Sequence, residues 1–313
     1  MCFVCSFIVV MMSLTIPVSQ GWGDIGHSAI ANVAYRTLSP HTLRAVLLVL
    51  LGAEEHQSYS DKEKEDGAAV FEAAATWADA VKHNSEYIFS GPLHYANPDD
   101  DEPSRCELVG KDGSSFCPYE TSPCLLGALK NYTNRLILPS SSAKDAAEAA
   151  KYWLRFVGDL HQPLHLSGRQ MGGNTAEAAF ATSSSPSSTA RPRHLNLHAV
   201  WDTAVIGRAL HEEFGNNYSA FVEHLLSCSR YFFAGHENSE ILPTTINSAY
   251  FRWARESNAL NCLVVWPVYD QTHGRLNERP DYYVSAIRTV ERQLVFAGRR
   301  LASVLEHIFS TIE

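Results

Sequence analysis

The sequence is poor in positive charge. Its 313 residues contain 25 lysines and arginines against 34 aspartates and glutamates, which gives a formal net charge of -9 at pH 7 with neutral histidines. A protein that holds nucleic acid through a broad basic surface needs the opposite balance, so this class of binding protein is excluded. Any polyanionic substrate would have to meet local cations. The C-terminus has neither an apolar span nor an anchor tail, so we expect a soluble protein without stable membrane association. We also expect a monomer.

Strand-like alternation is rare as well, and the sequence has no internal repeat. Hydrophobic residues make up 45% of the chain and charged residues 19%, which is typical of a globular protein. Helical periodicity recurs in segments 25–38, 68–82, 143–160, 201–210, 218–233 and 285–308. We therefore predict an all-α fold, with one mainly helical domain over residues 22–313.

Residues 1–21 resemble a secretory signal peptide. An apolar run covers residues 7–12 and continues through 14–18, and Ser19-Gln20-Gly21 places small residues at the two positions that a signal peptidase reads. The segment has no lysine or arginine before the run, and a signal anchor or a buried helix is the alternative. The run is short for a membrane span, which favours cleavage after Gly21. We expect export through the secretory pathway, to the medium or an endolysosome.

Cysteine usage agrees with export. Without the two cysteines of the signal segment, five remain, which allows two disulfides and leaves one free thiol. The residues alone do not give the connectivity. The sequons at Asn131 and Asn217 are candidate N-glycosylation sites in an exported protein.

Two segments interrupt the helical pattern. Residues 97–124 contain three consecutive aspartates, four prolines and three cysteines, which favours a loop held by a disulfide over a separate domain. Residues 181–193 are rich in serine, threonine and proline, and we interpret them as a low-complexity surface loop.

Histidines and aspartates recur at spacings that suit metal ligation. Asp159 ends a helical segment and Pro163 turns the chain, so that Asp159 and His165 can face a common cavity. Farther on, His198 and Asp202 are four residues apart on one helical face. A catalytic zinc needs three protein ligands and one position for water or substrate, and His165, His198 and Asp202 supply three suitable groups. A single pair of this kind is more often a hydrogen-bonded surface pair, so the combination carries the hypothesis.

Three further motifs join this set. They are Trp22-Gly-Asp-Ile-Gly-His27 at the expected new N-terminus, Trp77-Ala-Asp79, and His94-Tyr95. With Asp159 to His165, Gly172-Gly-Asn174 and His198 to Asp202, they make the chain resemble the class I nucleases over nearly its whole mature length. This zinc-dependent family includes mung bean nuclease, fungal single-strand nucleases and trypanosomatid 3′-nucleotidase/nucleases, and it shares its helical fold with bacterial phospholipase C.

The resemblance implies three zinc ions. Two would form a pair bridged by Asp159, one held by the free α-amine and carbonyl oxygen of Trp22 with His27, the other by Asp79 and His94. The third would be held by His165, His198 and Asp202. Such a cluster implies catalysis at Asp79 and Asp159, with hydrolysis of single-stranded DNA and RNA to 5′-nucleotides and removal of 3′-phosphate from 3′-nucleotides. An α-amine can bind zinc only after the signal peptide is removed.

One expected ligand is missing. The family has a histidine four residues before the bridging aspartate, where this chain has Arg155. A guanidinium stays protonated and has no lone pair for zinc. His161 is no substitute, because two residues rotate a helical side chain by about 200°. Three outcomes are open: water or a carboxylate replaces the imidazole, the protein works with two zincs, or it is an inactive homologue in which Arg155 fills the vacant charge site. We favour retained but weakened hydrolysis.

The resemblance also suggests substrate contacts and a disulfide pattern. Tyr95 offers an aromatic face for a nucleobase, although packing in the core is the commoner role of such a residue. Lys82 stands where the family has a phosphate-binding arginine, Asn97 where it has a base-reading aspartate, and Asn174 matches the remaining base contact. The suggested disulfides are Cys106 with Cys262 and Cys117 with Cys124, which leaves Cys228 free.

Two other functions compete with the nuclease hypothesis. A phospholipase C-like lipid hydrolase would share the fold and the zinc ligands, but the sequence has no amphipathic run suited to a membrane surface. A zinc- or nucleotide-binding homologue with impaired catalysis is supported by Arg155.

Overall fold

The chain forms an almost entirely helical fold in the parts that the computed structural model describes, which are residues 22–52, 67–98, 106–108, 117, 123–138, 142–183, 193–234 and 246–309. The α-helices are α1 (Asp24–Tyr35), α2 (Pro40–Leu51), α3 (Gly67–Val81), α4 (Leu125–Ile137), α5 (Ala143–Leu160), α6 (Leu197–Ala199), α7 (Val205–Glu212), α8 (Tyr218–Phe232), α9 (Ile246–Leu260), α10 (Trp266–Thr272) and α11 (Pro280–Phe309). The predicted all-α class is therefore confirmed. The expected signal peptide and most of the two predicted loops lie outside the described residues.

Helix α5 is the centre of the fold. Its bounds are those predicted from the periodicity, and it begins where the Ser142 side chain accepts a hydrogen bond from the backbone N–H of Asp145. Helices α1, α2, α3, α4, α9 and α11 all pack against it. Every residue of α5 from Tyr152 to Leu160 is buried, so the polar groups of this half of the helix lie inside the protein.

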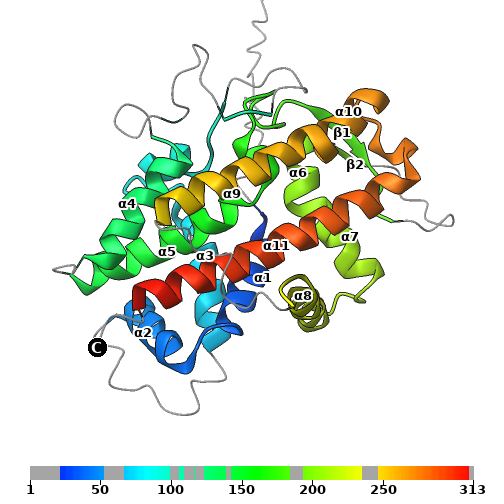
Figure 1. Cartoon of the computed structure of the whole chain (residues 1–313). Helices are drawn as coiled ribbons and strands as arrows, with labels where there is room; N and C mark the ends of the chain where they lie inside the picture. Colours follow the sequence, from blue (N-terminus) through cyan, green and yellow to red (C-terminus); the bar gives the residue numbers. More distant parts are fainter. Residues whose placement is uncertain are drawn as a thin grey trace, which may run out of the picture.

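The longest helix, α11, covers one side of the molecule and runs from orange to red in Figure 1. It packs against α1, α2, α5, α7 and α8. The prediction placed its start at residue 285, whereas the helix begins at Pro280, because proline is well suited to the first turn of a helix. No described helix combines the length and the apolar character that a membrane crossing requires.

Several elements were not predicted. Helices α2, α4, α9 and α10 were missed, as was an antiparallel hairpin of β1 (Glu177–Phe180) and β2 (Arg193–Asn196), in which Glu177 pairs with Asn196. The predicted helix over 201–210 is wrong at its start, because a π-helical turn, η5 (Val200–Ala204), precedes α7. Short 3-10 turns, η3 (Ile88–His94) and η4 (Pro163–Leu166), carry two of the histidines singled out above.

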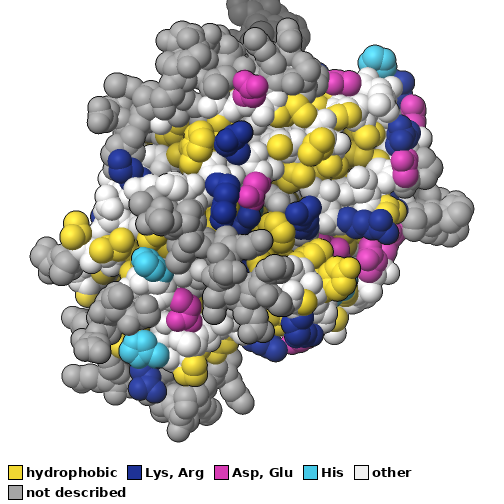
Figure 2. Space-filling model, viewed as in Figure 1, with side chains coloured by type: hydrophobic (Ala, Val, Ile, Leu, Met, Phe, Trp, Pro, Cys, Tyr) yellow, Lys and Arg dark blue, Asp and Glu magenta, His cyan; other side chains and the backbone are white. Residues whose placement is uncertain are grey.

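The surface agrees with the low positive charge of the sequence. In Figure 2, lysine and arginine side chains on the visible face alternate with acidic and apolar ones and form no continuous basic surface there. Buried polar groups, in contrast, gather in the C-terminal half of α5, where Arg155 and Asp159 lie inside the fold.

Candidate metal centre

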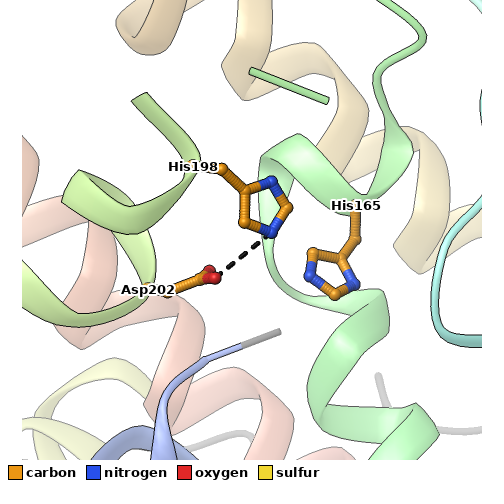
Figure 3. Close-up of side chains that lie close together, drawn as sticks. All are labelled: His165, His198 and Asp202. Carbon is orange, nitrogen blue, oxygen red and sulfur yellow. Dashed lines mark ion pairs between the residues drawn. The ribbon is translucent and has the colours of Figure 1, made fainter. Parts of the chain in front are cut away.

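Three of the predicted ligands come together from separate elements. His165 lies on η4, His198 on α6 and Asp202 on the π-helical turn η5, and all three are buried. One candidate ligand atom of each residue lies within 4.8 Å of the other two. Nε2 of His198 is 3.2 Å from an Asp202 carboxylate oxygen, and the two imidazole rings face the same space (Figure 3). Among the described residues this is the one such set of three, and it could hold a metal ion.

Backbone carbonyls fix the orientation of both rings. Nδ1 of His165 donates to the carbonyl oxygen of His94, and Nδ1 of His198 donates to that of Gly172, each at 2.6 Å. Because a carbonyl oxygen only accepts, each Nδ1 carries a proton, which leaves each Nε2 as the candidate ligand atom. The Nε2 atom of His165 is buried without a hydrogen-bond partner in the described structure, as expected of a metal ligand.

The carboxylate of this set is also held in place. The side-chain amide of Gln162 donates to Oδ1 of Asp202 at 2.6 Å, and its own oxygen accepts from the backbone N–H of Leu164. Gly172 has a φ of +63°, and a Cβ there would lie 2.6 Å from the Leu164 carbonyl oxygen. This position therefore requires glycine, and the resulting turn brings its carbonyl to His198. The sequence analysis missed Gln162, although it lies inside the quoted motif.

Asp159 is the second centre of the buried polar groups. It lies in the last turn of α5, is completely buried, and lies 3.2 Å from Nε2 of His27 and 2.8 Å from Nδ1 of His94. Nδ1 of His165 is 3.8 Å away, so Asp159 and His165 do face a common space, as the turn at Pro163 predicts. A Cβ at Gly158 would lie 2.7 Å from the His27 ring, so glycine allows His27 on α1 to lie against α5.

The charge of Arg155 dominates the electrostatics around Asp159. Burial alone would raise the pKa of the Asp159 carboxyl, but the Arg155 guanidinium and the hydrogen bonds of His27 and His94 hold this pKa well below its usual range. Burial, reinforced by the same guanidinium, lowers the pKa of His27. Asp159 is therefore a carboxylate and His27 a neutral imidazole at neutral pH.

Arg155 connects Asp159 to Asp79. Its Nη2 lies 2.7 Å from Oδ2 of Asp79 on α3, and its Nε lies 3.3 Å from Oδ1 of Asp159. The arginine is completely buried, whereas the Asp79 side chain is 19% exposed. Lys82 approaches Asp79 from the more open side at 3.4 Å. Asp79 thus lies between two cations.

Trp22 lies beside the same centre. It is completely buried, and the backbone N–H of the next residue, Gly23, donates to the backbone carbonyl of Asp202 at 3.0 Å. The first described residues are thereby attached to the turn that carries Asp202. His161, in contrast, faces away from Asp159, because its ring contacts the Val157 carbonyl and Arg300. Both ring nitrogens of His161 thus have partners outside the set around Asp159.

The residues predicted to contact the substrate differ in their surroundings and in their exposure. The side-chain amide of Asn174 is 3.3 Å from Nδ1 of His198, so Asn174 adjoins the three-residue set. Tyr95 is half-buried and directly follows His94, and Lys82 is half-buried beside Asp79. Asn97 is exposed.

The cysteines pair as the resemblance suggested. Cys106 is joined to Cys262 and Cys117 to Cys124, and Cys228 is free. Asn131 on α4 and Asn217 at the start of α8 are both exposed, as a glycosylated residue must be.

Comparisons with known proteins agree with this geometry. The model of the S1/P1 nuclease family matches residues 22–310. Nuclease P1 of Penicillium citrinum is 29% identical over 298 residues, which cover 92% of this chain and 97% of that protein. Endonuclease 2 of Arabidopsis thaliana is 29% identical over 96% and 97% of the two chains, and nuclease S1 of Aspergillus oryzae is 27% identical over 93% of each. With a buried set of residues that could hold a metal ion, and with a family match over nearly all of its length, the chain belongs to the S1/P1 nucleases and is a nucleic-acid hydrolase.

Proposed function

We propose that this protein is an exported zinc-dependent nuclease that cleaves single-stranded DNA and RNA to 5′-nucleotides and removes the 3′-phosphate from 3′-nucleotides. The observation that carries the proposal is the buried set of His165, His198 and Asp202, with its candidate ligand atoms within 4.8 Å of one another. Two imidazole nitrogens and a carboxylate oxygen are a suitable donor set for a catalytic zinc. The relatives named above are nucleases and endonucleases, which favours this function over a phospholipase C-like one.

The proposed zinc ligands beyond this set differ in how well they fit. His27 is neutral, buried and 3.2 Å from Asp159, and Trp22 is buried beside the Asp202 turn, which supports Trp22, His27 and Asp159 as the ligands of a second ion. Asp79 and His94 fit a third ion poorly, because the guanidinium of Arg155 lies against Asp79. When bound, zinc lowers the pKa of a water molecule to produce a nucleophile and neutralises charge on the phosphate oxygens.

The residues of the chain have distinct tasks in this proposal. Asp159 stays ionised and orients His27 and His94, and the carbonyls of His94 and Gly172 orient His165 and His198. Lys82, on the more open side of Asp79, binds substrate phosphate. We further propose that Tyr95, Asn97 and Asn174 contact the nucleobase.

Export is part of the same proposal. Cleavage after Gly21 would make Trp22 the first residue, and its free α-amine would become available to zinc within a buried environment. We also propose N-glycosylation at Asn131 and Asn217. The exported protein would be a monomer in which residues 22–313 form one domain. N-terminal sequencing of the exported protein should begin at Trp22.

The direct test is hydrolysis by the purified, cleaved protein. We expect cleavage of denatured DNA over duplex DNA, and release of phosphate from a 3′-nucleotide. Chelation should abolish both activities and added zinc should restore them. Absence of hydrolysis of either substrate in the presence of zinc would contradict the proposed activity and leave the alternative that Arg155 raises, a zinc- or nucleotide-binding homologue with impaired catalysis.

A further inference from the structure

The positively charged side chain of Arg155 lies inside the protein and not on its surface. It is completely buried in the middle of the protein, and its guanidinium bridges carboxylates from two helices, Asp79 of α3 and Asp159 of α5. A buried charge needs compensation by opposite charge and hydrogen bonds. Arg155 obtains it from groups that would otherwise be suitable oxygen ligands for a metal ion.

The neighbouring groups complete what looks like a metal-binding donor set. His94 and His27 contact the carboxylate of Asp159, and Lys82 contacts Asp79. Asp79, Asp159 and His94 together offer oxygen and nitrogen donors, which is the chemistry that zinc selects. Yet in the part of the chain that the structure describes, these three do not bring their donor atoms within 4.8 Å of one another, whereas His165, His198 and Asp202 do.

The guanidinium explains this difference. A guanidinium group carries a positive charge in proteins and has no lone pair to give to a metal. A divalent ion between Asp79 and His94 would lie against this positive charge and would compete with it for the same carboxylate oxygens. The negative charge of the carboxylates in this donor set is therefore already neutralised by a side chain of the protein itself.

We propose that Arg155 is the resident cation of the pocket formed by Asp79, His94 and Asp159, and that it takes the place of a zinc ion there. This inference rests on the proposed zinc-dependent function. It implies that the loaded protein binds two zinc ions instead of the three implied by the resemblance.

Zinc stoichiometry tests the inference without relying on activity. The exported protein, beginning at Trp22, would be stripped with a chelator, loaded with excess zinc and desalted, and zinc per chain would be measured by elemental mass spectrometry. We expect two zinc ions in the native protein and three in Arg155→His, because an imidazole would add a neutral nitrogen donor to Asp79, His94 and Asp159. A folded Arg155→His protein that binds no additional zinc would overturn the inference.

Arg169→His is the matched control. Arg169 is also paired with an aspartate, since its guanidinium donates to both carboxylate oxygens of Asp270 at 2.7 and 3.0 Å, but it lies outside the set around Arg155. This variant places a new histidine beside a carboxylate and should leave the count at two. A gain of one zinc in the control as well would contradict the assignment of the gain to the Arg155 pocket.

Asp79→Asn provides a second variant, which changes a residue of α3 and leaves Arg155 itself in place. Asp79 holds Arg155 and no zinc in this proposal, so the count should stay at two. A native protein with three zinc ions, of which Asp79→Asn loses one, would overturn the inference and leave the zinc-dependent function intact. A native count of zero would instead contradict the zinc-dependent function itself, and the inference with it.

Discussion

The two ends of the buried polar centre use similar residues in different ways. At one end, His165, His198 and Asp202 bring two imidazole rings and one carboxylate together. At the other end, Asp79 and Asp159 offer carboxylates and His94 a nitrogen, but the guanidinium of Arg155 lies between the two carboxylates. One end has donors without a resident cation, whereas the other end has its cation built into the chain.

The difference lies in what each group is bonded to. The rings of His165 and His198 donate Nδ1–H to backbone carbonyls, which leaves each Nε2 available. The oxygens of Asp79 and Asp159 that contact Arg155 are already neutralised by a positive charge. A list of residue types would make the two ends appear equivalent, and only the hydrogen-bond partners distinguish them.

Removal of the internal cation should have the largest effect. Arg155→Met leaves the buried Asp159 and the nearby Asp79 without their shared positive charge, and breaking a buried pair in this way costs about 3–5 kcal/mol of unfolding free energy. Urea unfolding in zinc-free buffer would measure the loss. The control is Arg36→Met, which breaks an exposed pair with Glu223 at 2.9 Å and should cost less than about 1 kcal/mol. Equal losses of unfolding free energy in the two variants would contradict the role of Arg155 as a buried internal cation.

Removal of a ligand at the metal-binding end should abolish most of the activity. His198→Ala deletes one of three donors, and we expect kcat/KM on denatured DNA to fall by at least about 100-fold. Even the loss of a residue that only hydrogen-bonds to a metal ligand lowers metal affinity or activity by about 10–100-fold. The zinc count should fall by one. His224→Ala removes another histidine paired with a carboxylate, at 3.0 Å from Glu291, and should retain activity. Full activity of a zinc-depleted His198→Ala protein would exclude this end as the catalytic one.

A smaller effect is expected from the group that holds Asp202. Gln162→Leu removes the amide that donates to Asp202 at 2.6 Å, and zinc affinity should fall by about 10–100-fold. Competition with a chromophoric chelator measures this affinity. Gln293→Leu is the matched control, because Gln293 is also a buried glutamine but donates to the His161 carbonyl and Ser257. Similar affinities in the two variants would show that Asp202 needs no such support.

The smallest effect is expected at the more open side of Asp79. Lys82→Gln removes a partly exposed cation without touching the buried groups, so unfolding free energy should change by less than about 1 kcal/mol. If Lys82 binds substrate phosphate, KM for a 3′-nucleotide should rise by about two- to fivefold, the range expected from an exposed charge pair. Lys144→Gln, which changes an exposed lysine near Glu148, should leave KM unaltered. An unchanged KM in Lys82→Gln would remove Lys82 from the substrate site.

The sequence was most informative where one helix determines the geometry. The bounds of α5 were predicted correctly from the helical spacing of its apolar residues. The position of His165 against Asp159 followed from the turn at Pro163. The start of the segment that carries Asp202 was predicted wrongly, because a π-helical turn leaves no trace in an apolar repeat counted at 3.6 residues per turn.

Contacts between distant segments could not be predicted from the sequence. The carbonyls of His94 and Gly172 orient His165 and His198 through backbone atoms, which every residue possesses and no motif reveals. Arg155 was recognised as a departure from the family pattern, but its pairing with Asp79 depends on how α3 packs on α5. The sequence identified the residues of interest, whereas the packing of the helices determined their partners.

Anomalous diffraction at the zinc absorption edge, from crystals of the exported protein grown with zinc, would test the difference between the two ends most directly. We predict a strong anomalous peak between His165, His198 and Asp202, and no peak between Asp79 and His94, where the Arg155 guanidinium should appear in the electron density. An anomalous peak between Asp79 and His94, with Arg155 displaced from Asp79, would contradict the account.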